Sequence, residues 1–150
     1  MMTETAHIHL SIPASSEFVV VARLSVSGIA ARMNFTVEDI EDIKIALSEA
    51  CTNAIQHAYD QHEGGGKKID IHFILAGDKL EIEVRDTGVG FNPQGVISKK
   101  QTDASASDQF GLGLGLTFIK SLMDAYDIQS ELGKGTVVKM VKYVSQIIPA

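Results

Sequence analysis

The sequence predicts a two-layer α/β (α+β) sandwich, in which a mixed but mostly antiparallel sheet carries helices on one face. Two patterns support this fold class. In two segments before residue 60, apolar residues recur every three or four positions, as in helices that bury one side. Segments before and after that region alternate between apolar and polar residues, as in half-buried strands. Because short turns join neighbouring strands, we expect antiparallel pairing.

The first two elements are expected to be an edge strand and a helix. The alternating stretch from His7 to Ile12 predicts the strand, and Pro13 ends it. Ser15 or Ser16 is a suitable N-cap for the helix that follows. The predicted apolar side of this helix consists of Phe18, Val21, Leu24, Ile29 and Met33.

A second helix is predicted from Thr36 onward. Asp39 follows Thr36 by three residues, in the arrangement of a capping box. The stripe expected to be buried along this helix consists of Ile40, Ile43, Leu47, Ala50, Ala54 and Ala58. Glycines at 64–66 then predict a turn.

The remaining chain predicts four strands and one helix. Residues 68–76 and 80–86 alternate, and Gly77-Asp78 between them favours a hairpin. The polar stretch 92–110 predicts a long loop, which in a compact domain is usually a functional lid or disordered. Glycines from residue 111 lead into an apolar helix that reaches residue 123. Residues 128–132 and 136–143 predict a closing strand pair.

Composition narrows the classes of function. The 150 residues, 45% hydrophobic and 21% charged, predict one globular domain over 1–150 with a lid at about 95–110. A net charge of -6 without a clustered basic patch argues against binding nucleic acid. Cys51 is the only cysteine, which excludes an internal disulfide and fits a reducing cytoplasm. We see no signal sequence and no membrane-spanning run, so we expect a cytoplasmic protein.

A glutamate and an asparagine lie one turn apart on the second predicted helix. Glu49 and Asn53 therefore share a helix face beside the apolar stripe. A carboxylate can orient or deprotonate an attacking hydroxyl, and an amide oxygen is a hard ligand that suits Mg²⁺. Taken alone, the pair is more simply a surface glutamate and a helical asparagine.

The strand predicted over 80–86 ends in Asp86-Thr87-Gly88-Val89-Gly90-Phe91. An ionised carboxylate only accepts hydrogen bonds, so Asp86 suits the amino group of adenine and opposes the carbonyl of guanine. Gly88 and Gly90 allow the backbone to pass close to a flat base. The alternative is an ordinary turn after a strand. Two glycines at a strand end favour the nucleotide interpretation.

Two further glycine motifs follow. Gly111, Gly113 and Gly115 begin a predicted helix, where exposed N–H groups and the helix dipole can hold phosphates; a flexible hinge is the alternative. Gly133-Lys134-Gly135-Thr136 lacks the Gly-Lys-Ser/Thr order of a phosphate-binding loop, so it predicts a hairpin turn. The Thr136 hydroxyl near the adenine edge would be an added role.

In this order, the four motifs resemble the N, G1, G2 and G3 boxes of the GHKL ATPases, which include gyrase, sensor histidine kinases and MutL. The stretch from Glu41 to Tyr59 is similar to the anti-sigma-factor serine kinases, especially the anti-sigma-B type. The resemblance extends from the first predicted helix to Tyr143 and is weakest over 95–109. It implies the Bergerat, or histidine-kinase-like, ATPase fold, with ATP or ADP and Mg²⁺ between sheet and helices.

The resemblance also implies a role for each matching residue. Glu49 would be the catalytic base and Asn53 the Mg²⁺ ligand, with Asp86 anchoring adenine and the Thr136 hydroxyl beside it. The implied nucleotide-loop glycines are Gly88, Gly90, Gly111, Gly113 and Gly115. Arg23 on the first helix resembles a partner-contact arginine, with a solvated helix charge as the alternative. The basic residues available near a γ-phosphate are Lys99, Lys100 and Lys120, and no motif selects among them.

The implied function is an ATP-dependent serine/threonine protein kinase. It would phosphorylate an anti-sigma-factor antagonist, and it would bind and inhibit a sigma factor until unmodified antagonist releases it. The family also implies a homodimer through the first strand and helix. Two alternatives stay open: a nucleotide-gated binding module with little kinase activity, and an orphan ATPase domain serving a histidine kinase in trans. Retention of Glu49 favours phosphotransfer over the first, and the lack of a phosphoacceptor-helix segment disfavours the second.

Overall fold

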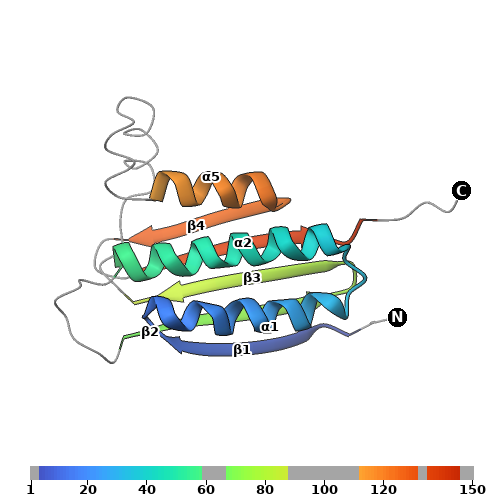
Figure 1. Cartoon of the computed structure of the whole chain (residues 1–150), viewed down its shortest axis with the longest axis horizontal. Coiled ribbons are helices and arrows are strands. Elements are labelled where there is room, and N and C mark those ends of the chain that lie inside the picture. Colours follow the sequence, from blue (N-terminus) through green and yellow to red (C-terminus); the bar gives the residue numbers. More distant parts are fainter. Residues whose placement is uncertain (1–3, 59–66, 88–111, 132–134, 146–150) are drawn as a thin grey trace, which may run out of the picture.

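Five strands form one sheet in the computed structural model, which describes residues 4–58, 67–87, 112–131 and 135–145. The strands are β1 (Ala6–Pro13), β2 (Lys68–Ala76), β3 (Lys79–Asp86), β4 (Ala125–Glu131) and β5 (Gly135–Tyr143). Their order is β1-β2-β3-β5-β4, which makes β1 and β4 the edges (Figure 1). Every ladder between the described strands is antiparallel, as expected for most of the sheet.

The helices lie together on one face of this sheet, which confirms the predicted two-layer fold (Figure 1). A 3₁₀ turn, η1 (Ser16–Phe18), leads into α1 (Val19–Ala31). Helix α2 (Val37–Asn53) continues into a π-helical turn, η2 (Ala54–Ala58), and α5 (Leu112–Leu122) is the last helix. In Figure 1, α1 lies on the β1 side, α5 on the β4 side and α2 between them. Within the described ranges, every helix is too short or too polar to cross a bilayer.

The hydrophobic core fills the space between sheet and helices. Alternate side chains of the central strands point into it, namely Ile69, Ile71, Phe73 and Leu75 from β2 and Leu80, Ile82 and Val84 from β3. The predicted α2 stripe is confirmed for Ile43, Leu47, Ala50 and Ala54, which are buried, and for the half-buried Ile40. The side chain of Ala58 lies outside the described residues. Each fully buried large apolar side chain contributes roughly 1.5–3 kcal/mol, so this layer supplies most of the stability.

The β2–β3 hairpin also follows its prediction. Ala76 and Lys79 are paired, which leaves Gly77-Asp78 as the two-residue loop. Gly77 has a φ of 63°, in the left-handed region that glycine adopts without a side-chain clash. Strand β3 begins at Lys79, one residue before the alternation predicted it.

Helix α1 differs from its prediction in where it starts and which side it buries. Ser15 makes no capping hydrogen bond, and Phe18 occupies the N-cap position after the 3₁₀ turn. The buried residues are Val19, Ala22, Val26, Ile29 and Ala30. The prediction is confirmed for Ile29 and Met33, which are buried, and for Phe18, which packs against the core, whereas Val21 is 38% exposed and Leu24 is 68% exposed. Apolar residues occur on every side of α1, so periodicity alone did not fix which side faces the core.

Strand β4 begins at Ala125, three residues before its predicted start at Ile128. The reason is a set of polar contacts between the end of α5 and β5. The backbone N–H of Tyr143 donates to Asp124 Oδ2 at 2.7 Å, and Asp124 N–H donates to the Val141 carbonyl at 2.9 Å. Lys142 Nζ donates to the Leu122 carbonyl at 2.6 Å, satisfying an acceptor that the helix end leaves open. These contacts hold the chain extended although its side chains are largely polar.

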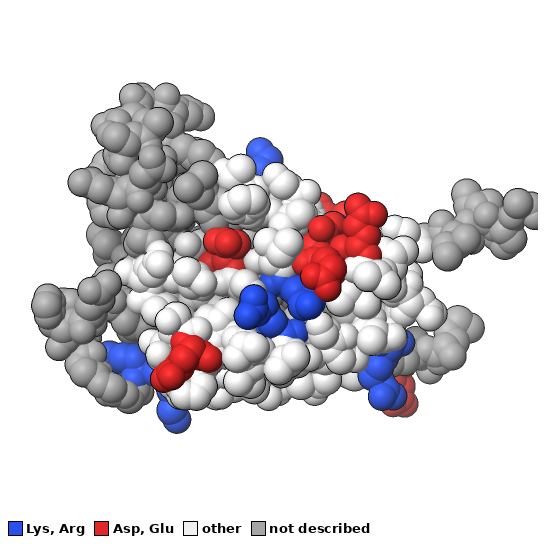
Figure 2. Space-filling view, in the orientation of Figure 1, with Lys and Arg blue, Asp and Glu red and all other residues white. Residues whose placement is uncertain are grey.

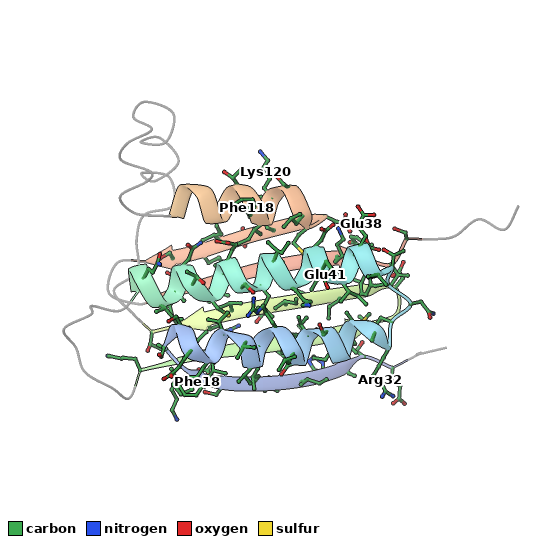
Figure 3. All side chains as sticks on the ribbon, viewed as in Figure 1. Phe18, Arg32, Glu38, Glu41, Phe118 and Lys120 are labelled. Carbon is green, nitrogen blue, oxygen red and sulfur yellow. The ribbon has the colours of Figure 1, made fainter. Side chains whose placement is uncertain are left out.

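The N-terminus of α2 is capped as its sequence predicts. The backbone N–H of Asp39 donates to Thr36 Oγ1 at 3.0 Å. This bond satisfies one of the N–H groups that the first turn leaves without a helical partner. Acidic side chains gather at this end of α2, where the helix dipole favours negative charge (Figure 2). Glu38 and Glu41 lie there on the exposed side of the helix (Figure 3).

We expect Thr36→Ala to lower the free energy of unfolding by about 1 kcal/mol, because the Asp39 N–H loses its acceptor. Thr36→Ser keeps a hydroxyl at the same position and should retain most of the stability. Chemical denaturation followed by circular dichroism measures both variants. Equal stability of Thr36→Ala and the parent would show that the cap contributes nothing.

Candidate functional site

Several elements converge at one end of the molecule. In Figure 1, the end of α2, the end of β3 and the starts of β5 and α5 all lie on the left. The β3–β5 ladder pairs Asp86 with Thr136 at this end. The η2 turn contacts both strands, so the helix that carries Glu49 and Asn53 ends against the same part of the sheet. The four predicted non-glycine nucleotide residues therefore come from elements that meet here.

Asp86 and Thr136 form the buried strand part of this site. Asp86, the last residue of β3, is 8% exposed, and Thr136 is 6% exposed. Thr136 Oγ1 lies 2.8 Å from Ser130 Oγ on β4, and Ser130 Oγ also donates to the Gly135 carbonyl at 3.3 Å. Ser130 therefore fixes the orientation of the Thr136 hydroxyl. Sequence analysis missed Ser130, because only the β4–β5 register places it opposite Thr136.

Gly135 allows β3 and β5 to approach each other at this point. Its φ of 89° lies in the left-handed region. A Cβ built at Gly135 would overlap the carbonyl oxygen of Asp86 and lie 2.9 Å from Thr87 Cα. Any side chain here would therefore push the start of β5 away from the end of β3. The glycine motif predicted a turn, but the sequence holds no local signal for this contact.

Glu49 and Asn53 lie one turn apart on α2, as predicted. Glu49 is half-buried, and Asn53, the last residue of α2, is 8% exposed. The π-helical turn η2 begins directly after Asn53, and such wide turns often occur at functional sites. Cys51 between them is fully buried, and burial raises the pKa of its thiol to about 12. The thiol is therefore neutral at physiological pH and is not a reactive thiolate.

The glycine loops are only partly described. Gly113 and Gly115 lie in the first turn of α5, whose N-terminus faces the same end of the molecule (Figure 1). The first N–H groups of a helix have no helical partner and suit phosphate oxygens. Gly88, Gly90, Gly111 and the predicted lid at about 95–110 lie outside the described residues.

The predicted basic residues lie apart from this cluster or outside the described ranges. Arg23 is exposed on α1, the helix on the β1 side of the sheet. Lys120 is exposed on α5, and its side chain points away from α2 (Figure 3). Lys99 and Lys100 lie outside the described residues. The side chain of Lys120 in this conformation is therefore not directed toward Asn53.

The residues present fit an adenine nucleotide. A buried carboxylate at a strand end can only accept hydrogen bonds, which matches the amino group of adenine. A fixed hydroxyl lies opposite it, and the Gly135 contact keeps this corner free of side-chain bulk. An amide at the end of α2 and a helix N-terminus at α5 complete a set of groups that suits a phosphate chain with a hard cation.

Comparison with known proteins gives consistent results. Residues 12–142 match the family model described as histidine kinase-like ATPase domain. Proteins named serine-protein kinase RsbW from Bacillus velezensis, Bacillus cereus (strain Q1) and Bacillus subtilis are 41%, 44% and 39% identical to this chain. Each match covers 97% of this chain and 90% of the relative.

A solved structure supports the fold as well. The crystal structure of the RsbU and RsbW domains of a Mycobacterium tuberculosis protein matches 95% of this chain with a TM-score of 0.67 and 22% identity. This chain spans 33% of that longer chain. At this identity the match bears on the fold and not on the activity.

We expect Gly135→Ala to lower the free energy of unfolding by roughly 2–5 kcal/mol, since a left-handed alanine costs about 1–2 kcal/mol and the steric overlap adds about 1–3 kcal/mol. Binding of a fluorescent ATP analogue should fall with it, because the Asp86–Thr136 corner opens.

Gly77→Ala is the matched control. Gly77 also has a left-handed φ, of 63°, but a Cβ there meets nothing within 4 Å. It should lose only about 1–2 kcal/mol of stability and bind the analogue normally. Equal effects of the two substitutions would show that the contact with Asp86 is not important.

Proposed function

The chain belongs to the serine-protein kinase RsbW family and carries its histidine kinase-like ATPase domain, and from that premise we propose that it phosphorylates a serine or threonine of a small antagonist protein. We further propose that it binds and inhibits a sigma factor, which the unmodified antagonist releases. The observation that carries the proposal is the convergence of Asp86, Thr136, Asn53 and Glu49 at one end of the fold. A module that only binds nucleotide has no need for the carboxylate of Glu49 beside Asn53.

Asp86 supports selectivity for adenine. Its carboxylate is held at a strand end, 8% exposed, where a bound base would be shielded from water. If guanine took the place of adenine there, its carbonyl would face the Asp86 carboxylate, and neither group could donate a hydrogen bond to the other. Leaving both groups without a partner away from water costs binding free energy. The Thr136 hydroxyl opposite it would contact the same edge of the base.

Asn53 and Glu49 would divide the work at the phosphate end. The Asn53 amide oxygen would hold Mg²⁺, which neutralises charge on the transferring phosphoryl group when it is bound. The substrate hydroxyl oxygen bonds to the γ-phosphorus as the bond to the leaving β-phosphate oxygen breaks. Glu49 would accept the proton of that hydroxyl. One helical turn separates the two side chains, so one rigid element sets their relative position.

The N-terminal elements are the proposed surface for protein partners. Leu24 on α1 is 68% exposed and Val20 is 42% exposed, on the helix that carries the exposed Arg23. Large apolar side chains beside an arginine are typical of protein interfaces. Among the described strands, β1 is an edge of the sheet, and one side of its backbone pairs with no other strand there. We therefore propose that Arg23 contacts a partner protein and that two copies of the chain form a homodimer through β1 and α1. As a separate proposal, the protein acts in the cytoplasm.

ATP and ADP should bind in the presence of Mg²⁺, and GTP should bind at least roughly tenfold more weakly. The expected difference corresponds to about 1–3 kcal/mol for a lost buried hydrogen bond. Asp86→Asn should weaken ATP binding without unfolding the domain, because the amide has nearly the same shape. Isothermal titration calorimetry measures all three affinities. Equal affinity for ATP and GTP would contradict the proposed role of Asp86.

Glu49→Gln should bind ATP almost normally but lose phosphotransfer to the antagonist by roughly 10²–10⁴-fold, because the side chain keeps its shape and loses its proton acceptor. Binding of the sigma factor should survive, since it requires no chemistry. Asn53→Ala should instead weaken Mg²⁺-dependent nucleotide binding. The assays are transfer of label from γ-labelled ATP to the antagonist and a pull-down of the sigma factor.

Glu41→Gln is the control for this experiment. Glu41 lies on the same helix but is exposed and pairs with Lys44 at 3.1 Å, so its loss should leave phosphotransfer unchanged. If Glu49→Gln transfers phosphate as fast as Glu41→Gln, then Glu49 is not the base. If the parent transfers none to any antagonist encoded beside it, the protein is a nucleotide-gated binding module.

A further inference from the structure

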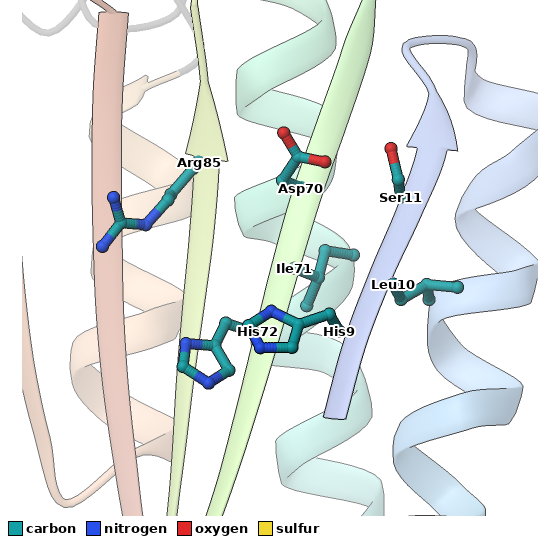
Figure 4. A pocket seen from close by; sticks show the side chains of 7 residues that line it. All are labelled: His9, Leu10, Ser11, Asp70, Ile71, His72 and Arg85. Carbon is teal, nitrogen blue, oxygen red and sulfur yellow. The ribbon is translucent and has the colours of Figure 1, made fainter. Parts of the chain in front are cut away.

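The sheet face opposite the helices carries a row of ionisable side chains. His9, His72, Glu83, Lys139 and Asp127 are successive cross-strand partners, so the row crosses all five strands. Its β1–β2 end contains imidazoles, and Figure 4 shows His9 and His72 side by side at a hollow of about 450 Å³. The sheet separates this face from α2, the helix that carries Glu49 and Asn53.

Three histidine rings form a stack that joins β1 to β2. The ring of His72 on β2 lies with its centroid 4.1 Å from that of His9 and 5.1 Å from that of His7, both on β1. The interplanar angles are 18° and 30°, so the rings are nearly parallel. The described residues contain no group of side chains arranged to hold a metal.

The contact between His7 and His72 limits how many protons the stack can hold. His7 Nδ1 lies 2.9 Å from His72 Nε2, which requires one nitrogen to donate and the other to accept. One ring of the pair must therefore be neutral, because an imidazolium has no acceptor. A second proton on this pair would place two N–H groups against each other. The stacked His9 ring adds a further cation when it is protonated.

The charged neighbours of His72 do not remove this limit. Glu83 Oε2 lies 3.8 Å from His72 Nδ1, but it accepts from Arg85 Nη2 at 2.9 Å, and Lys139 Nζ lies 3.5 Å from Oε1. Glu83 is thus already paired with two cations. The carboxylates of Asp70 on β2 and Glu81 on β3 also belong to this face. No other charged group of the described strands lies next to the rings in the cross-strand register.

The pKa of His72 is lowered from 6.5, first by burial and then by His9, His7 and Arg85, while Glu83 opposes the shift. The pKa of Glu83 is lowered although burial alone would raise it, because Arg85 and Lys139 stabilise its charge. A histidine with a lowered folded pKa favours the neutral, folded form. Its contribution to stability is complete above about pH 6.5 and is lost as the pH falls from there toward the folded pKa.

We propose that the three stacked histidines form a proton-sensitive latch that holds the edge strand β1 on β2 and releases it as the pH falls. Strand β1 has β2 as its only partner strand among the described residues, and the stack joins these two strands directly. A strand that detaches breaks the hydrogen bond between His7 and His72, so neither ring of the pair then has to stay neutral to act as an acceptor. Each proton taken up on opening then favours the open form. This inference does not depend on the proposed phosphotransfer.

The test is hydrogen exchange of the full chain in EDTA between about pH 7.5 and about pH 5, with protection corrected for intrinsic exchange at each pH. Protection of residues 6–13 should fall below about pH 6.5 by about tenfold per pH unit for each proton taken up on opening. Strand β4 is the internal control, because it is the other edge and contains no histidine. If β1 and β4 lose protection in parallel, the latch is wrong.

Two variants separate proton uptake from ordinary packing. His9→Phe combined with His72→Phe keeps two flat rings in the stack but removes His72 and its hydrogen bond with His7, so the pH dependence of β1 protection should flatten. His9→Phe alone should reduce the slope, because His9 is one of the charges that lower the pKa of His72, and this exposed position is open to substitution even if the double variant folds poorly. The proposal would be overturned by an unchanged pH dependence in His9→Phe, together with NMR titrations of His7, His9 and His72 in the parent that give ordinary pKa values.

Discussion

The approach of the Gly135 backbone to the carbonyl of Asp86 determines how the candidate nucleotide site of this fold is built. Without a Cβ, and with a φ of 89°, Gly135 lets β5 start directly against the end of β3. That start sets the β3–β5 register, which places Thr136 opposite Asp86, and the β4–β5 register, which places Ser130 beside Thr136. The η2 turn after Asn53 contacts the same two strands. One steric constraint therefore brings together groups from β3, β4 and β5, and the end of α2 packs against two of these strands.

Different interactions stabilise the two faces of the sheet, even at adjacent residues of one strand. Ile82 and Val84 are buried against the helices, whereas Glu83 between them is 6% exposed on the other face. Its burial comes from Arg85 and Lys139, which pair with it and keep it ionised. A paired buried carboxylate contributes little net stability, but removing one partner would leave a costly charge. Charge pairing therefore holds the side chains of the outer face in place. Because these pairs exist only while Glu83 is ionised, the outer face is sensitive to protonation, whereas the apolar core is not.

Sequence analysis correctly predicted the buried side of those helices and strands whose apolar pattern allows only one orientation. The three- and four-residue spacing along α2 and the strict alternation of β2 and β3 fixed which side chains point inward. In α1, three consecutive valines at 19–21 are compatible with several orientations, and the structure buries Val19 together with Ala22, Val26, Ile29 and Ala30. Contacts between distant segments left no local signal. The Gly135–Asp86 contact and the stack of His7 on His72, 65 residues apart, both follow from strand register, which a single sequence does not reveal. The roles of the site residues came from motif resemblance, and the structure adds their convergence.

Strand β1 connects the two surfaces that the proposals assign to regulation. Its inner side contacts α1, which carries the exposed Leu24 and Arg23, and its outer side carries His7 and His9. A partner that binds α1 with β1 in place stabilises the paired form of the strand. On the proposed latch the paired form holds fewer protons, so thermodynamic linkage requires that such binding weaken as the pH falls and that it be accompanied by proton release. Partner binding and proton binding on this chain then oppose each other through a single edge strand, without any change at Asp86 or Asn53.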